Sequence, residues 1–117
     1  MNDPEVTMPE STRRKDLVAY SKALEAAGLA LALGRGVPAP LRSLAAQLVR
    51  AASSVPANLA EGHGRFSRDR MQHWRIAYGS AKEVDCHLRL LAQAGAVDSR
   101  RAETALKLFD EVRAMTW

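Results

Sequence analysis

Apolar residues recur between residues 74 and 91 at spacings that alternate between three and four. They are Trp74, Ala77, Ala81, Val84, Leu88 and Leu91. This alternation places all six on one face of an α-helix and is typical of a helix that packs in a bundle. The repeat predicts a long third helix, running from Ser67 as N-cap to Ala94 with Gly95 as C-cap.

The residue usage of the whole chain points to the same class of fold. Only 5 % of the 117 residues are aromatic, although 47 % are hydrophobic, so Leu, Ala and Val must build the core. Strands favour β-branched and aromatic side chains, whereas Ala, Leu and Arg are good helix formers. The length suits one domain and is too short for two ordinary cores. We therefore expect a single all-α domain.

Three further helices are predicted around the long one. The first begins near Ser11 or Thr12 and ends at the glycines around residue 35; Leu17, Ser21, Leu24, Gly28 and Leu31 share one of its faces. The second runs from about Pro40 to Glu61, with an apolar seam of Leu41, Leu44, Leu48, Ala52 and Val55, and Pro56 is expected to kink it. The fourth opens at Asp98 or Ser99, with Ala102, Ala105, Leu106, Phe109, Val112 and Met115 facing inward.

Short connections between these helices favour antiparallel neighbours, so the expected fold is an up-and-down four-helix bundle over residues 13–117. Residues 1–12 contain two prolines and little apolar periodicity, and we expect a flexible N-terminal arm there.

Several classes of protein are disfavoured by the composition. Cys86 is the single cysteine, so no disulfide can form within one chain, which fits a reducing compartment. The acidic N-terminus does not resemble a secretory signal, and no uninterrupted apolar run approaches 18 residues. We expect a cytoplasmic protein that does not associate with membranes.

Positive charge is concentrated in the middle of the chain. Eight basic and two acidic residues lie between Arg35 and Lys82, which gives this segment a net charge of +6 within a total of +4. Of the 17 basic residues, 13 are arginine, whose planar guanidinium suits phosphate and carboxylate groups. An arginine bias of the genome is an alternative explanation.

Two motifs carry a resemblance to a known family. The segment from residue 54 to residue 65 reads Ser-Val-Pro-Ala-Asn-Leu-Ala-Glu-Gly-His-Gly-Arg, and the segment from residue 76 to residue 84 reads Ile-Ala-Tyr-Gly-Ser-Ala-Lys-Glu-Val. Together they resemble the signature of the four-helix-bundle proteins first noted in 23S rRNA intervening sequences. Its matching positions here are Pro56, Asn58, Glu61, Gly62, Gly64, Gly79, Ser80 and Glu83.

The resemblance implies properties that spacing alone does not give. It implies an antiparallel four-helix bundle that assembles as a homopentamer. It also implies a likeness to the accessory variability protein of diversity-generating retroelements, which binds nucleic acid and a reverse transcriptase. Many members of the family have no assigned role.

The signature residues have structural explanations as well as functional ones. Asn58 and Glu61 share a helical face, where Asn58 is expected to bond backbone freed by Pro56 and Glu61 to pair with Arg65 or cap the third helix. Gly79 is expected to allow close approach of another helix, within the bundle or across a subunit boundary. The alternative is an enzyme site of unknown type around Asn58, Glu61 and His63.

No cofactor and no metal site are predicted. The turn at residues 62–64 follows a helix and lacks the Lys-Ser/Thr of a P-loop, and Cys86 and His87 point about 100° apart on a helix.

The basic residues are the best functional candidates. We expect nucleic acid to contact Arg42, Arg50, Arg65, Arg68, Arg70 and Arg75. The leading hypothesis is a non-enzymatic homopentameric scaffold that binds RNA or DNA with weak sequence specificity, as an accessory to a reverse transcriptase or another nucleic-acid enzyme. The alternatives are a solvated charged surface and an adaptor that docks an acidic protein.

Overall fold

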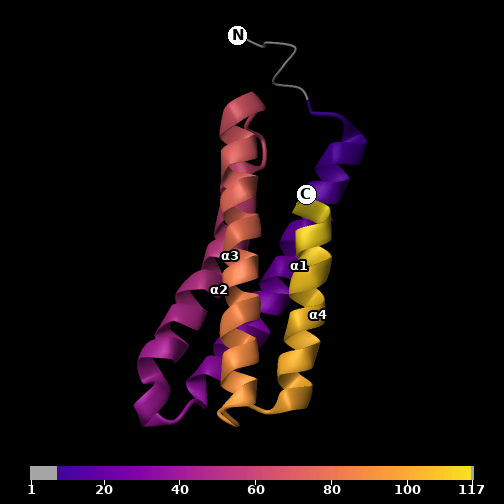
Figure 1. Cartoon of the computed structure of the whole chain (residues 1–117). Helices are drawn as coiled ribbons and strands as arrows, with labels where there is room; N and C mark the ends of the chain where they lie inside the picture. The colour runs from indigo at the N-terminus through magenta and orange to yellow at the C-terminus, as the bar shows by residue number, and fades with distance from the viewer. Residues whose placement is uncertain (1–7, 117) are drawn as a thin grey trace.

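Four helices lie side by side in the computed structural model, which describes residues 8–116 without the side chain of Ser67. In chain order they are α1 (Glu10–Arg35), a short 3₁₀ segment η2 (Ala39–Leu41), α2 (Arg42–Gly62), α3 (Ser67–Gln93) and α4 (Ser99–Thr116). Successive helices run in opposite directions (Figure 1). The helices α1 and α3 each pack against α2 and α4, so α1 and α3 occupy opposite corners. The predicted antiparallel four-helix bundle is confirmed.

Most helix ends follow the predicted signals, but the predicted N-cap of α3 is wrong: Phe66 occupies the N-cap position and Ser67 is the first residue of the helix. The Asp98 carboxylate accepts a hydrogen bond from the backbone N–H of Arg101 at 3.0 Å, which is the expected N-cap of α4. Gly95, just beyond α3, has a φ of 71°, and Gly64, in the turn between α2 and α3, has a φ of 85°. Both turns use backbone conformations that favour glycine.

The start of α1 corrects one prediction. The helix begins at Glu10, so residues 10–12 are helical and do not belong to an arm. Proline suits the start of a helix, and the Pro9 carbonyl accepts a hydrogen bond from the backbone N–H of Arg13 at 3.0 Å. The acidic side chain of Glu10 also favours the positive end of the helix dipole. Residues 1–7 of the predicted arm lie outside the described residues.

The face of α1 that the leucine spacing picks out is exposed to solvent. Leu17 is 56 % exposed and Leu24 is 49 % exposed. The buried face instead carries Ala19, Ala23, Ala26, Ala27, Ala30 and Leu33. Alanine allows α2 and α4 to approach α1 closely, so the small residues pack inward and the leucines point outward.

The other predicted seams are confirmed. Leu48, Val55 and Leu59 of α2 are fully buried, and so are five of the six residues of the α3 repeat, with Trp74 partly buried. On α4, Phe109 and its predicted neighbours are buried, whereas Met115 is exposed. Among the described residues, 12 of the 23 buried hydrophobic ones are alanine, so the core is narrow and the bundle is a rod measuring 54 × 22 × 18 Å.

Helix α1 also meets the length and composition of a membrane-spanning segment. Its mean hydropathy reaches 1.3 over 18 residues, and one third of that stretch is buried in the bundle. The outward leucines account for this value, because they add apolar character to a helix whose alanine face already packs in the core. The absence of membrane association stays a prediction.

Candidate nucleic-acid interface

The six candidate arginines do not form one surface. Arg42 begins α2, whereas Arg65, Arg68 and Arg70 lie beyond its other end. At 1.5 Å per residue, α2 separates them by roughly 30 Å. Arg42 therefore lies far along the rod from the arginines near the start of α3, although all six are among the residues that we expect to contact nucleic acid.

Two of these arginines form ion pairs at the surface. Arg50 lies 3.0 Å from Glu83 across the α2–α3 interface. Arg65 lies 2.7 Å from Glu61, as the sequence suggested, and 3.8 Å from Asp69. Each pair neutralises positive charge locally, although exposed pairs of this kind are weak.

Arg70 is the most strongly held of the six. Its two terminal nitrogens lie 2.6 and 2.7 Å from the two carboxylate oxygens of Asp16 on α1. His63 Nδ1 is 2.9 Å from the same carboxylate, and the Arg70 guanidinium stacks 4.5 Å from the centre of the Trp74 ring. Burial of Asp16 raises its pKa, but the hydrogen bonds and charges of Arg70 and His63 outweigh it and hold the pKa below the ordinary value. Arg70 therefore ties α3 to α1 and is not free to bind a phosphate.

Arg68 and Arg75 remain exposed and have no ion-pair partner within residues 8–116. They begin a row of basic residues spaced seven apart on the outer face of α3: Arg68, Arg75, Lys82 and Arg89. We call it the α3 row. The Lys82 ammonium lies 5.9 Å from the centre of the Tyr78 ring, and Arg89 Nε donates to Asp85 at 2.7 Å.

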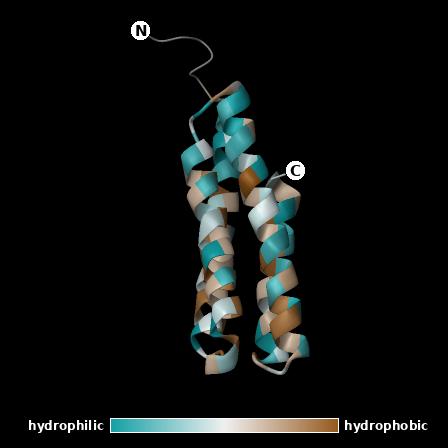
Figure 2. Ribbon diagram, turned by 60° about the vertical axis from the view of Figure 1, so that its left-hand side comes forward, coloured by the Kyte–Doolittle hydropathy of each residue, from teal (hydrophilic) through white to brown (hydrophobic). Residues whose placement is uncertain are grey.

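Lys82 was counted in the net charge of the sequence, but neither it nor Arg89 was among the predicted binding residues. The seven-residue spacing of the basic residues is the signal that identifies the row, because it repeats one helical face. The end of the bundle where α3 begins is mostly hydrophilic (Figure 2).

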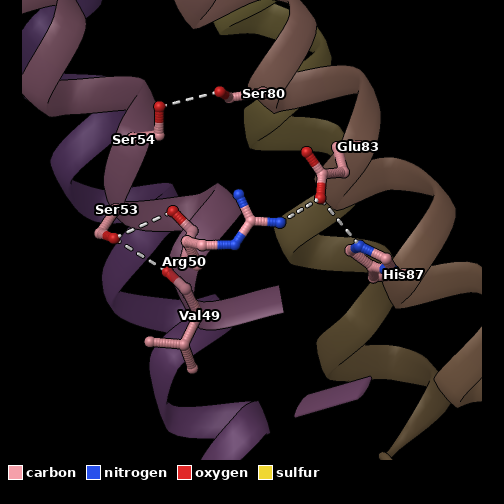
Figure 3. Close-up of polar contacts among 7 residues, drawn as sticks. All are labelled: Val49, Arg50, Ser53, Ser54, Ser80, Glu83 and His87. Atoms are coloured by element: carbon pink, nitrogen blue, oxygen red, sulfur yellow. Dashed lines mark hydrogen bonds and ion pairs between the residues drawn. The ribbon is translucent and has the colours of Figure 1, made fainter. Parts of the chain in front are cut away.

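The signature residues form a polar seam between α2 and α3. The Asn58 amide donates to the Ser54 carbonyl at 2.9 Å, and its oxygen lies 3.0 Å from His73 Nδ1. The Ser80 hydroxyl donates to the Ser54 hydroxyl at 2.9 Å across the interface (Figure 3). Asn58 therefore holds α2 against α3, but the carbonyl that it bonds is that of Ser54 and not that of Ala52, which Pro56 leaves free.

Glu83 is the second link in this seam. One of its carboxylate oxygens accepts from Arg50 at 3.0 Å and lies 3.3 Å from His87 Nε2, so it sits between the two basic side chains (Figure 3). This contact assigns Glu83 a bracing role between α2 and α3.

The residues of the alternative enzyme site do not converge. Asn58 bonds to Ser54 and His73, Glu61 to Arg65, and His63 to Asp16. The partners come from different elements: His73 from α3, Arg65 from the turn after α2, and Asp16 from α1. Within residues 8–116, no three His, Cys, Asp or Glu side chains are close enough to hold a metal ion.

The two helical glycines of the signature differ in their surroundings. A Cβ on Gly62 would lie 2.6 Å from Cδ1 of Trp74, so the start of α3 packs directly on this residue. A Cβ on Gly79 would meet nothing within 4 Å. The alternative in which Gly79 admits another helix of the same bundle is therefore wrong.

Comparison with known proteins agrees with the fold and the signature. The family model described as 23S rRNA-intervening sequence protein matches residues 15–117. No curated protein matches the chain. The crystal structure of a protein of unknown function from the S23 ribosomal protein family of Bacteroides thetaiotaomicron is similar, with a TM-score of 0.78, 25 % identity, and coverage of 87 % of this chain and 94 % of that one. The chain belongs to the 23S rRNA-intervening sequence protein family.

Proposed function

We propose that this protein is a non-enzymatic cytoplasmic scaffold that assembles as a homo-oligomer and binds the nucleic-acid backbone through the α3 row. The observation that carries the proposal is the free charge at the start of α3. Arg68 and Arg75 are exposed, and no residue three or four positions from either is acidic. Their guanidinium groups are therefore available to phosphates.

The shape of the row suits a polyanion. Arg68 and Arg89 are 21 positions apart, or roughly 32 Å of helix, which is close to one turn of a nucleic-acid duplex. Contacts of arginine and lysine with phosphates position a nucleic acid but carry little sequence information. We therefore expect binding that depends on charge and length more than on sequence.

Self-assembly is supported by where the large apolar residues lie. Within the described part of the chain, more than half of the buried hydrophobic residues are alanine, while several leucines on α1 and α3 are exposed. Exposed apolar surface of this kind is typical of protein interfaces. The pentamer is the state that the family resemblance implies, and five copies of the row would bind one polyanion multivalently.

The partners are proposed on the same basis. The description of the family refers to 23S rRNA, so structured RNA is the first probe to use. The likeness to the retroelement accessory protein adds a reverse transcriptase as the proposed protein partner.

Retention of labelled RNA and DNA by the purified assembly tests this proposal at several salt concentrations. The variant Arg68→Ala/Arg75→Ala should weaken binding and reduce the slope of log affinity against log salt by about two for each protomer engaged. Arg100→Ala/Arg101→Ala is the matched control, because it removes two exposed arginines at the other end of the rod. Equal binding by the two variants would overturn the proposed surface. Binding of an acidic protein without nucleic acid would favour the adaptor.

A further inference from the structure

Two outward apolar stripes lie on opposite corners of the bundle. The α1 stripe consists of Leu17, Ser21, Leu24, Gly28 and Leu31. The α3 stripe consists of Ile76, Gly79, Cys86 and Leu90 with the ion-paired Glu83 among them; Ile76 is 43 % exposed and Leu90 is 51 % exposed. The two ends of each stripe are 14 positions apart, or roughly 21 Å of helix. Since α1 and α3 occupy opposite corners of the bundle, neither stripe can cover the other in one copy.

Both stripes face the α2 side of the bundle. Leu31 lines a groove with Ala46 and Val49 of α2, and Glu83 pairs with Arg50 of α2. Counting roughly 100° per residue, the α1 stripe lies about 140° from the middle of its buried face, and the α3 stripe lies about 130° away in the opposite sense. The two stripes therefore point roughly at a right angle to one another, one on each flank of α2.

We infer that the α1 stripe of one copy packs on the α3 stripe of the next copy, which closes a ring with α2 on its inner side. This inference rests on the proposed self-assembly and specifies its contact. The two stripes differ and lie on opposite corners, so the contact is heterologous. The helices α1 and α3 run in the same direction, so rotation about an axis along the bundle brings them together in parallel (Figure 1). Each copy then contacts its two neighbours in directions that differ by roughly a right angle. Repeating this contact closes a ring of about four to five copies.

The stripes are complementary in size when they are paired in parallel. Both alternate spacings of three and four residues, and the parallel register that places Ser21 opposite Ile76 aligns four positions of each stripe, with Leu17 and Leu90 left at the two ends. In that register Leu24 lies opposite Gly79, and Leu31 lies opposite Cys86. The smaller Ser21 lies opposite Ile76. The open space over Gly79 is then filled by a leucine of the neighbouring copy.

The charges beside the stripes are complementary as well. Glu25 borders the α1 stripe and has no ion-pair partner within residues 8–116. The same register places it against the basic side of the α3 stripe, between Arg75 and Lys82. Glu25 contributes only one carboxylate for each copy, so the α3 row keeps a net positive charge. The row lies on the outer rim of the ring.

The native Cys86 makes the register testable in the full chain. In Leu31→Cys, a short bismaleimide should join residue 31 of one copy to Cys86 of the next, giving a ladder of covalent oligomers that ends at a closed ring. Ser21→Cys is the matched control, because it lies roughly 15 Å along the helix from the level of Cys86 in this register and should not cross-link. Cross-linking of Ser21→Cys alone would show an antiparallel contact, and cross-linking of Leu31→Cys in a Cys86→Ala background would show an α1–α1 contact. Either result overturns the inference.

A second variant separates this inference from the proposed assembly. Gly79→Trp points into open space and should leave the helical circular dichroism unchanged. It should raise the concentration at which the protein dissociates by at least tenfold, measured by light scattering. A native chain that is monomeric at every concentration would refute the assembly itself. Oligomers that tolerate Gly79→Trp, or native chain that partitions onto neutral phosphatidylcholine vesicles through α1, would refute the contact.

Discussion

The buried carboxylate of Asp16 offers the sharpest test of what holds the bundle together. Asp16 is 4 % exposed and joins three helices, because Arg70 of α3 binds both of its oxygens and His63 follows the end of α2. Asp16→Asn keeps the shape of the side chain but removes its charge. Breaking a buried ion pair by changing one partner costs about 3–5 kcal/mol. Arg70 retains some exposure to water, so we expect about 3 kcal/mol and a fall in Tm of about 10 °C.

The effect should depend on pH in a defined direction. The pKa of Asp16 is below its ordinary value of 3.8 in the folded protein. A lowered pKa gives stability that is present above the unfolded pKa and is lost as pH falls through the folded pKa. The difference in the free energy of unfolding between the wild type and Asp16→Asn should therefore have its full size at pH 5 to 7, and it should shrink from about pH 4 downward.

Urea denaturation, followed by circular dichroism at one protein concentration, measures both effects. Asp69→Asn is the matched control, because Asp69 is exposed and lies 3.8 Å from its partner Arg65. The control should cost less than about 0.5 kcal/mol. If Asp16→Asn cost no more than the control, or if its penalty were unchanged at pH 2, the buried ion pair would not stabilise the fold as argued.

Three other substitutions test separate parts of the bundle. Gly62→Ala should lower the free energy of unfolding by about 1–3 kcal/mol, because its Cβ would approach Trp74 to 2.6 Å; an unchanged urea midpoint would contradict this packing. Phe109→Ala should cost about 3–5 kcal/mol in the same assay, because it is the largest fully buried side chain among the described residues. Asp98→Ala should cost about 1 kcal/mol and speed hydrogen exchange in the first turn of α4, whereas Asp98→Ser should restore most of the loss.

The sequence predicted the seams of α2, α3 and α4 because each of those helices has one face richer in large apolar residues. Helix α1 differs in having two apolar faces, one of alanines and one of leucines. Periodicity identifies a face but does not say which one turns inward. That choice depends on the neighbouring helices, which contribute large side chains such as Leu48 and Phe109 and leave space only for alanine.

The candidate site was less predictable because its ion pairs differ in sequence separation. The pair of Glu61 and Arg65 is local and follows from helical spacing. The pair of Asp16 and Arg70 joins residues 54 positions apart, and no local pattern indicates it. Counting charge along the chain therefore included Arg70 as free and overlooked the row that continues to Arg89.

The faces of α3 now carry separate tasks, and this separation makes the function accessible to experiment. Its buried face holds the core. The polar seam of Ser80 and Glu83 lies on its α2 side, the α3 stripe lies next to that seam and shares Glu83 with it, and the α3 row lies beyond the stripe. Assembly through the stripes would repeat the α3 row around a ring. The affinity of the ring for a long polyanion should then exceed the affinity of a single copy by a factor much larger than the number of copies in the ring. Gly79→Trp would keep every arginine of the row and lose this multivalent gain. A monomeric variant that binds long RNA as tightly as the ring would show that the row acts alone, and the link between assembly and binding would fail.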